Sequence, residues 1–250
     1  MDLSQMDPAG IGSESPDPGK RMALADEIEN AVGLICLGIN MMKKSALYER
    51  RLFFPLMMLS SGIERITKVV FCMLYFKRKH EMPCRSLING HDLVKALERV
   101  EQEMQQSPTD HHMMAISALG GKLSDPMTRA ILEVLSVFGN QGRYYSLNTL
   151  ESGHDPKCDF DRLWGEQVES PLYLKNPMLR SIEPAQRRLE VVYEVQVSIE
   201  CLLRLIGQIV KDGGFGVLGN LAHRRLRRFT YLQDAALGLG DYSDWDKLWV

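Results

Sequence analysis

Apolar residues recur at alternating intervals of four and three positions over most of the chain, which is the spacing of one face of a helix. This pattern predicts a first helix over about residues 21–45 and a longer second helix over about 48–79. The apolar stripe of the second helix comprises Leu52, Leu56, Leu59, Ile63, Ile66, Val70 and Met73. Because no sustained strand-like alternation occurs, we expect an all-α helical bundle.

Turn residues divide the middle of the chain into shorter segments. A third helix is expected to carry Leu93, Leu97, Val100 and Met104, and a short segment after it ends at Gly120-Gly121. Ser124-Asp125-Pro126 is a typical helix start, and the helix that it opens is expected to end at Gly139. A polar loop with Gly153, Pro156 and Pro171 is expected to follow.

Two helices are predicted in the last third of the chain. The longer one runs from about Glu183-Pro184 to Lys211, with Gln196 at the one polar position of its apolar stripe. The second covers about residues 218–236 and contains a cluster of arginines.

Composition limits the function classes. The formal net charge of -2 gives no overall attraction to nucleic acid or to an anionic membrane, so either would need a local basic patch. The five cysteines are scattered and form no CxxC pair, which indicates free thiols in a reducing compartment. The most apolar stretch contains Glu64, Arg65 and Lys68, which disfavour a membrane-spanning helix. We therefore expect a soluble, cytoplasmic protein without membrane contact.

Three short elements stand in a fixed order along the first part of the chain. Glu64 and Lys68 are spaced to face each other on one side of the second helix. Gly90-His91-Asp92-Leu93 opens the third helix, where Asp92 can cap the helix, and Arg143-Tyr144 follows a later helix. In this order they resemble the Glu-x-x-x-Lys, His-Asp-Leu and Arg-Tyr elements of the HEPN family of helical bundles, which occur in prokaryotic defence and toxin–antitoxin systems.

The resemblance covers about residues 22–150 and implies a division of the chain. Residues 1–20 are expected to be a disordered leader, residues 21–150 a HEPN-like bundle, and residues 151–236 a helical extension packed on that bundle. Residues 237–250 are expected to be a tail in which Trp245 and Trp249 serve as anchors.

The resemblance also bears on activity. HEPN ribonucleases carry an arginine followed within a few residues by a histidine on a late helix, where the two act on an RNA phosphate. The matching pair here is Arg85 and His91, with five intervening residues, but it lies before the third helix instead of on a late one. This placement weakens the ribonuclease interpretation.

Several other residues can be read in two ways. Arg143 and Tyr144 can grip a nucleotide or phosphate, or can be a helix-terminal arginine and a packed ring. Arg224, Arg225 and Arg228 can bind RNA phosphates, or can pair with the acidic tail or with another subunit, and we favour the pairing. His80 and Cys84, with His154 and Cys158, match no defined zinc motif, so we expect no metal and no cofactor.

The leading hypothesis is a non-catalytic HEPN-like module that forms a homodimer through its long helices and binds a partner protein, a nucleotide or RNA. Glu64, Lys68 and Asp92 are then structural residues. The first alternative is a divergent, metal-independent HEPN ribonuclease with Arg85 and His91 as catalytic residues. The second is a helical scaffold protein.

Overall fold

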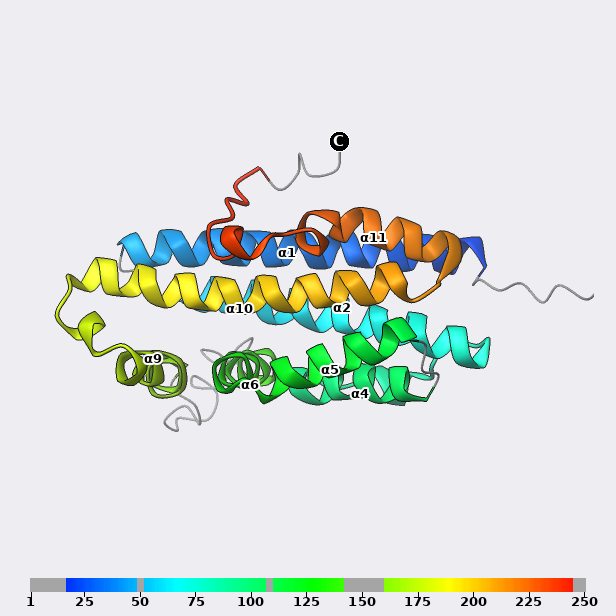
Figure 1. Ribbon diagram of the computed structural model, residues 1–250, viewed down its shortest axis with the longest axis horizontal. Coiled ribbons are helices and arrows are strands. Elements are labelled where there is room, and N and C mark those ends of the chain that lie inside the picture. The colour runs from blue at the N-terminus through cyan, green and yellow to red at the C-terminus, as the bar shows by residue number, and fades with distance from the viewer. Residues whose placement is uncertain (1–16, 49–51, 107–109, 142–159, 245–250) are drawn as a thin grey trace, which may run out of the picture.

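A computed structural model describes residues 17–48, 52–106, 110–141 and 160–244. Within these residues every regular element is a helix, so the all-α prediction is confirmed (Figure 1). No helix in the described part of the chain is long and apolar enough to cross a membrane.

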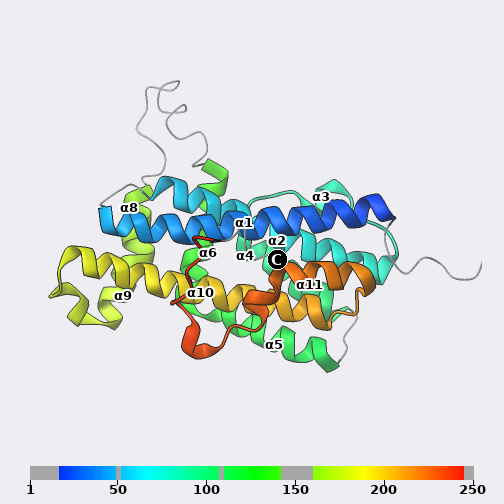
Figure 2. The same ribbon diagram turned by 90° about the horizontal axis from the view of Figure 1, so that it is seen from above.

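Three long helices run along the length of the molecule. They are α1 (Pro18–Tyr48), α2 (Phe53–Lys79) and α10 (Pro184–Asp212). Figures 1 and 2 show α1 and α10 side by side. Glycine allows α1 and α2 to approach closely: a Cβ atom on Gly62 would lie 2.8 Å from the carbonyl oxygen of Ala31.

Shorter helices cover the long ones on two opposite sides. On one side α4 (Leu93–Gln105), α5 (Asp110–Ser124) and α6 (Pro126–Gln141) pack against α2 and α10. On the other side α11 (Gly216–Thr230) packs against α10 and α1, and the C-terminal segment crosses over the same pair (Figure 1). The long helices therefore form the middle layer.

One hydrophobic core joins the two halves of the chain. Helix α10 contacts α1, α2, α5 and α6, and its apolar residues belong to the same buried cluster as those of α2. The apolar stripes of α2 and α10, which led us to expect a homodimer, are thus covered by helices of the same chain. The dimer stays a prediction and would need another surface.

We expected a polar loop around Pro171, and this prediction is wrong for residues 160–180. These residues form α8 (Phe160–Trp164), the π-helix η4 (Gly165–Glu169), α9 (Ser170–Lys175) and the 3-10 helix η5 (Pro177–Arg180). Phe160, Trp164, Val168 and Leu172 are buried at intervals of four residues. That interval exceeds an α-helical turn of about 3.6 residues, and the wider π turn keeps these side chains on one face.

Other boundaries differ by a turn or more. Helix α1 begins at Pro18, so residues 18–20 of the expected leader are helical, while residues 1–16 lie outside the described ranges. Helix α5 continues through Gly120-Gly121 and ends at Ser124, so the expected stop at the two glycines is wrong. The last predicted helix is two elements: α11 ends at Thr230, and a 3-10 turn, η6, covers Asp234–Ala236.

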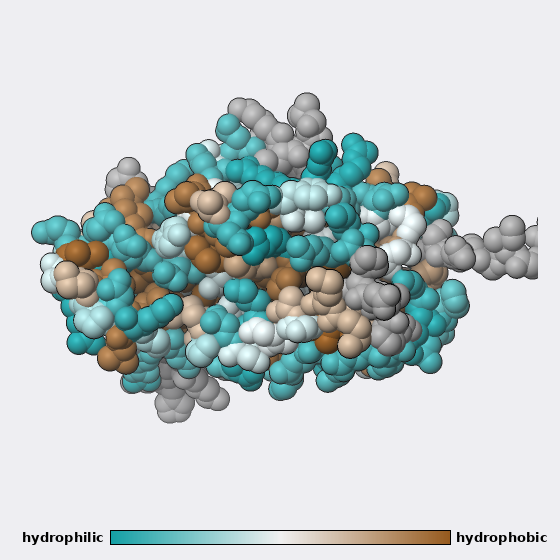
Figure 3. Space-filling view, in the orientation of Figure 1, coloured by the Kyte–Doolittle hydropathy of each residue, from teal (hydrophilic) through white to brown (hydrophobic). Residues whose placement is uncertain are grey.

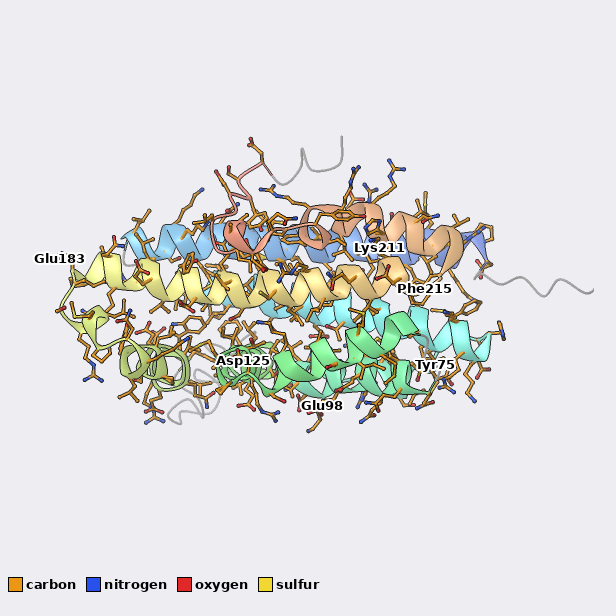
Figure 4. The ribbon with its side chains drawn as sticks, viewed as in Figure 1. Tyr75, Glu98, Asp125, Glu183, Lys211 and Phe215 are labelled. Atoms are coloured by element: carbon orange, nitrogen blue, oxygen red, sulfur yellow. The ribbon has the colours of Figure 1, made fainter. Side chains whose placement is uncertain are left out.

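The start of α6 follows the chemistry of its sequence. Asp125, labelled in Figure 4 at the turn after α5, accepts hydrogen bonds from the backbone nitrogen and the hydroxyl of Thr128, at 2.8 and 2.7 Å. Pro126 then occupies the first helical position, where a missing N–H costs nothing.

Candidate functional site

The structure brings together Glu64, Lys68 and His91, which we call the Glu64 cluster. The Glu64 carboxylate accepts a hydrogen bond from Lys68 Nζ at 2.7 Å, and its second oxygen lies 2.8 Å from Nδ1 of His91. Glu64 is only 8% exposed, although it carries a charge. The cluster links α2 to the loop before α4, across 27 positions of sequence.

These contacts favour the ionised form of Glu64. Burial opposes ionisation of Glu64, but the hydrogen bonds from His91 and Lys68 outweigh it and hold the pKa of the carboxyl below its ordinary value. A carboxylate only accepts, so Nδ1 of His91 carries the hydrogen. A neutral His91 ring then keeps its lone pair on Nε2, and the side chain is 39% exposed.

The residues around His91 set the start of α4. Asp92 is the N-cap of this helix: its Oδ1 accepts from the backbone nitrogen of Lys95 at 3.0 Å, and its Oδ2 lies 3.0 Å from Lys95 Nζ. Gly90, which precedes His91, has a backbone φ of +113°. Residues other than glycine rarely adopt this conformation. The loop geometry therefore depends on Gly90 and Asp92 together.

A small recess adjoins the Glu64 cluster. It has a volume of about 50 Å³ and lies between α2, the short helix α3 (Arg85–Ile88) and the first turns of α4. Its charged and polar walls are Thr67, Lys68, Asn89, Asp92, Lys95 and Arg99. We call it the α4 recess.

The two candidate catalytic residues are not joined in this structure. Arg85 was expected in a loop but begins α3, and its side chain is exposed. Within the described residues no hydrogen bond or ion pair links the Arg85 guanidinium to His91, whose Nδ1 is held by Glu64. Arg143 and Tyr144 lie outside the described residues.

The arginines of α11 contact other parts of the chain. Arg225 forms an ion pair of 2.7 Å with Glu29 on α1. Arg228 donates to the backbone carbonyl of Asp241 at 2.7 Å and lies 4.6 Å from the centroid of the Tyr242 ring. Arg224 is exposed. Arg228 thus reaches the acidic tail through a main-chain oxygen instead of the carboxylate of Asp241.

One residue that the sequence analysis missed organises the C-terminal segment. Glu200 on α10 is completely buried and accepts hydrogen bonds from Gln196 Nε2 at 2.6 Å, the backbone nitrogen of Gly238 at 2.6 Å and the Tyr242 hydroxyl at 2.5 Å. Lys43 on α1 adds a bond of 2.7 Å to the carbonyl of Gly240. Residues 237–244, the C-terminal strap, are held against the core by these groups.

The sequence feature that could have indicated the role of Glu200 is a pair of polar residues inside an apolar stripe. Gln196 and Glu200 are spaced i, i+4 on the buried face of α10, where a charge requires partners. The partners come from the strap, 38 and 42 positions further along. Trp245 and Trp249, the expected anchors, lie outside the described residues, so Tyr242 is the anchor that the structure shows.

A larger pocket of about 410 Å³ lies between the ends of α1 and α10 and the segment α8–η4. Trp164 and Glu169 line it, and the indole nitrogen of Trp164 donates to Glu169 at 3.1 Å. Near this end of the molecule hydrophobic residues come to the surface over α9 and the start of α10 (Figure 3). Leu174 and Met178 there are each 71% exposed.

The thiols within the described residues show no metal-binding arrangement. Cys84 is exposed and its sulfur contacts Ser86 Oγ at 3.0 Å, while His154 and Cys158 lie outside the described ranges. No group of three or more potential His, Cys, Asp or Glu ligands occurs in the described ranges.

Known proteins do not identify the chain. Comparison with protein-family models, with curated proteins and with solved structures gives no match. The function has therefore to be inferred from the residues of the chain itself.

Proposed function

We propose that this chain is a non-catalytic, HEPN-like helical module that binds a nucleotide or RNA, and that the Glu64 cluster and the adjoining α4 recess are the binding site. A role in prokaryotic defence or in a toxin–antitoxin system is part of this proposal and comes from the family resemblance alone.

The observation that carries the proposal is the buried carboxylate of Glu64, shared between Lys68 and His91. A buried charge with two partners fixes both of them in place. Lys68 thereby stands at the edge of a recess that Lys95 and Arg99 also line. Lysine and arginine beside a recess favour a phosphate-bearing ligand over a neutral one.

Two features disfavour catalysis. Phosphate cleavage by the HEPN family requires an arginine beside the histidine, and no hydrogen bond or ion pair joins Arg85 to His91 in the described residues. In addition, the hydrogen bond between Glu64 and the His91 ring joins α2 to the start of α4. This structural role is sufficient to explain why the two residues are paired.

Binding should be measured by isothermal titration calorimetry with AMP and with a short RNA. We expect Lys68→Met to weaken binding of both about tenfold, because it removes the fixed charge at the recess. The matched control is Lys79→Met at the exposed end of the same helix, which should bind within about twofold of the original chain. Equal binding by the two variants would contradict the proposed site.

One observation favours a second candidate, the metal-independent ribonuclease. A carboxylate on Nδ1 of a histidine orients Nε2 as a general base, and Glu64 and His91 have this relationship at 2.8 Å. This candidate predicts that purified protein cleaves RNA and that His91→Gln and Arg85→Ala both abolish cleavage while the circular dichroism spectrum is unchanged. Intact RNA after prolonged incubation would exclude it.

A further inference from the structure

The C-terminal strap, residues 237–244, lies on the helical bundle without belonging to a helix (Figure 1). Among its side chains Tyr242 is completely buried, whereas Leu239 is 68% exposed and Asp241 and Ser243 are also exposed. The apolar contact between the strap and the bundle therefore depends largely on the ring of Tyr242.

The helices beneath the strap contact it mainly through polar groups. Gln196 donates to the carbonyl of Gly240 at 3.0 Å, and Asn40 accepts from the backbone nitrogen of Tyr242 at 3.2 Å. The polar residues of α1, α10 and α11 that bond to the strap, which we call the strap site, are Asn40, Lys43, Gln196, Glu200 and Arg228. Water can solvate these groups when the strap leaves, so opening the site costs less than opening an apolar contact of the same size.

The segment that joins the strap to α11 can act as a hinge. It comprises residues 231–236, none of which is buried. Arg204 on α10 ties it to the bundle, donating to the carbonyl of Leu232 at 3.0 Å and to the carboxylate of Asp234 at 2.6 Å. Because no side chain of the hinge belongs to the core, its backbone can change course without leaving a cavity.

The strap site accepts a particular sequence. Gly238 has φ +77°, and a Cβ atom on it would collide with the ring of Tyr193. A Cβ on Gly240 would lie 2.8 Å from a carboxylate oxygen of Glu200, which accepts the hydroxyl of Tyr242. The site thus selects glycine, glycine and tyrosine at alternate positions, and a second copy of this chain carries that same segment.

We propose that the strap site is an interface between two copies of this chain, in which each copy places its strap on the strap site of the other. Every bond that the strap makes within one copy can also form between copies, because their sequences are identical. Reciprocal exchange closes a symmetric dimer. A copy's own strap competes at an effective concentration of about millimolar, so exchange is favoured at high protein concentration. This inference goes beyond the proposed function and does not depend on the Glu64 cluster.

The first experiment tests whether the strap site binds a strap supplied by another molecule. The probe is a fluorescein-labelled synthetic peptide of residues 237–244, added to the full chain and followed by fluorescence anisotropy. Tyr242→Ala weakens the chain's own strap and leaves the residues of the strap site unchanged. The matched control is Leu239→Ala, which alters a solvent-facing residue of the same strap.

We expect the peptide to bind Tyr242→Ala about tenfold or more tightly than it binds the original chain, because the competing strap is released. Leu239→Ala should bind it as weakly as the original chain does. A peptide carrying Tyr242→Phe should bind about tenfold more weakly than the tyrosine peptide, which is the effect of losing one hydrogen bond to a charged group. If circular dichroism shows Tyr242→Ala to be unfolded, Tyr242→Phe takes its place in the chain, with a smaller gain of the same sign.

The second experiment measures the molecular mass of the full chain by sedimentation equilibrium from micromolar to millimolar concentration. We expect the original chain and Leu239→Ala to change from monomer to dimer towards the millimolar end, and Tyr242→Ala to remain a monomer throughout.

Four results would overturn the inference. They are no peptide binding by the folded Tyr242 variant, equal binding of the tyrosine and phenylalanine peptides, a monomeric original chain at millimolar concentration, and a dimer that the Tyr242 variant forms equally well. The last result would place the contact between copies on another surface.

Discussion

The hydroxyl of Tyr242 donates a hydrogen bond of 2.5 Å to the carboxylate of Glu200, and both side chains are completely buried. Tyr242 also stacks on Phe229 of α11, with ring centroids 5.4 Å apart. Burial and the neighbouring carboxylate raise the pKa of Tyr242, so the hydroxyl stays protonated and remains a donor. This bond closes the C-terminal strap over α1, α10 and α11.

Replacing Tyr242 by phenylalanine should therefore destabilise the protein. The ring and its stacking remain, but Glu200 loses one of its donors while staying buried, which costs about 2 kcal/mol. Urea unfolding followed by circular dichroism measures the change. The control Tyr231→Phe alters a ring that is 50% exposed and should change the free energy of unfolding by less than about 0.5 kcal/mol. Equal effects of the two variants would show that the strap does not depend on this bond.

Two glycines should respond to alanine in opposite directions. A Cβ on Gly62 would lie 2.6 Å from Cγ1 of Ile35, so Gly62→Ala forces α1 and α2 apart and should cost about 1–3 kcal/mol. A Cβ on Gly121 in α5 would meet nothing within 4 Å, so Gly121→Ala should stabilise the protein by about 0.5–1 kcal/mol. Thermal unfolding of both variants tests the packing of the long helices, and a stabilising Gly62→Ala would contradict it.

The cap of α6 should make stability depend on pH. Partial burial opposes ionisation of Asp125, but its hydrogen bonds from Thr128 prevail and lower the pKa of the carboxyl. Because the pKa of Asp125 is lower in the folded than in the unfolded protein, the ionised carboxylate stabilises the folded protein fully above the unfolded pKa of about 3.9. This stabilisation is lost as the pH falls through the folded pKa.

Asp125→Ala should accordingly cost about 1 kcal/mol at pH 7. The difference from the original chain should shrink when the pH is lowered to about 3, because the cap is then partly protonated in both the native and the unfolded state. Urea unfolding at the two pH values measures it. A difference that does not change with pH would mean that the ionised carboxylate is not what stabilises the helix start.

The described thiols should differ sharply in reactivity. Burial raises the pKa of Cys36 to about 12 and that of Cys72 to about 11. Cys84 is exposed, and its hydrogen bond with Ser86 lowers the pKa of its thiol. The thiolate is the reactive form, so iodoacetamide at pH 8 should modify Cys84 well before Cys36 or Cys72. Peptide mass spectrometry checks this order, and early labelling of Cys36 would contradict the packing of α1.

Local pattern was sufficient to predict most of the helices. The stripes that contain Ile63 in α2 and Ile199 in α10 are buried as their spacing predicts, because helical periodicity reports a face directly. The segment around Trp164 was missed because Pro171, with Gly153 and Pro156 before it, is typical of a loop, and because its interval of four fits neither a strand nor a regular α-helix. The buried spacing of Phe160 and Trp164 was the informative feature.

Contacts between distant segments were harder to predict from the sequence. The i, i+4 spacing predicted the pair of Glu64 and Lys68, but nothing local indicates that His91 supplies the second partner. The partner of Glu200 was equally hard to predict, since Tyr242 lies on a segment without regular structure. Such buried polar contacts depend on tertiary packing, which a single sequence does not encode as a period.

The central claim is that the Glu64 cluster and the α4 recess bind a phosphate-bearing ligand without cleaving it. Fluorescence anisotropy of a short RNA with a 5′-phosphate and a 3′-fluorophore, followed over time after mixing, tests binding and cleavage together. We predict a rise that stays constant for the original chain and a rise shifted to about tenfold higher protein concentration for Lys68→Met. No rise, or a rise that decays to the value of short fragments, would contradict the claim.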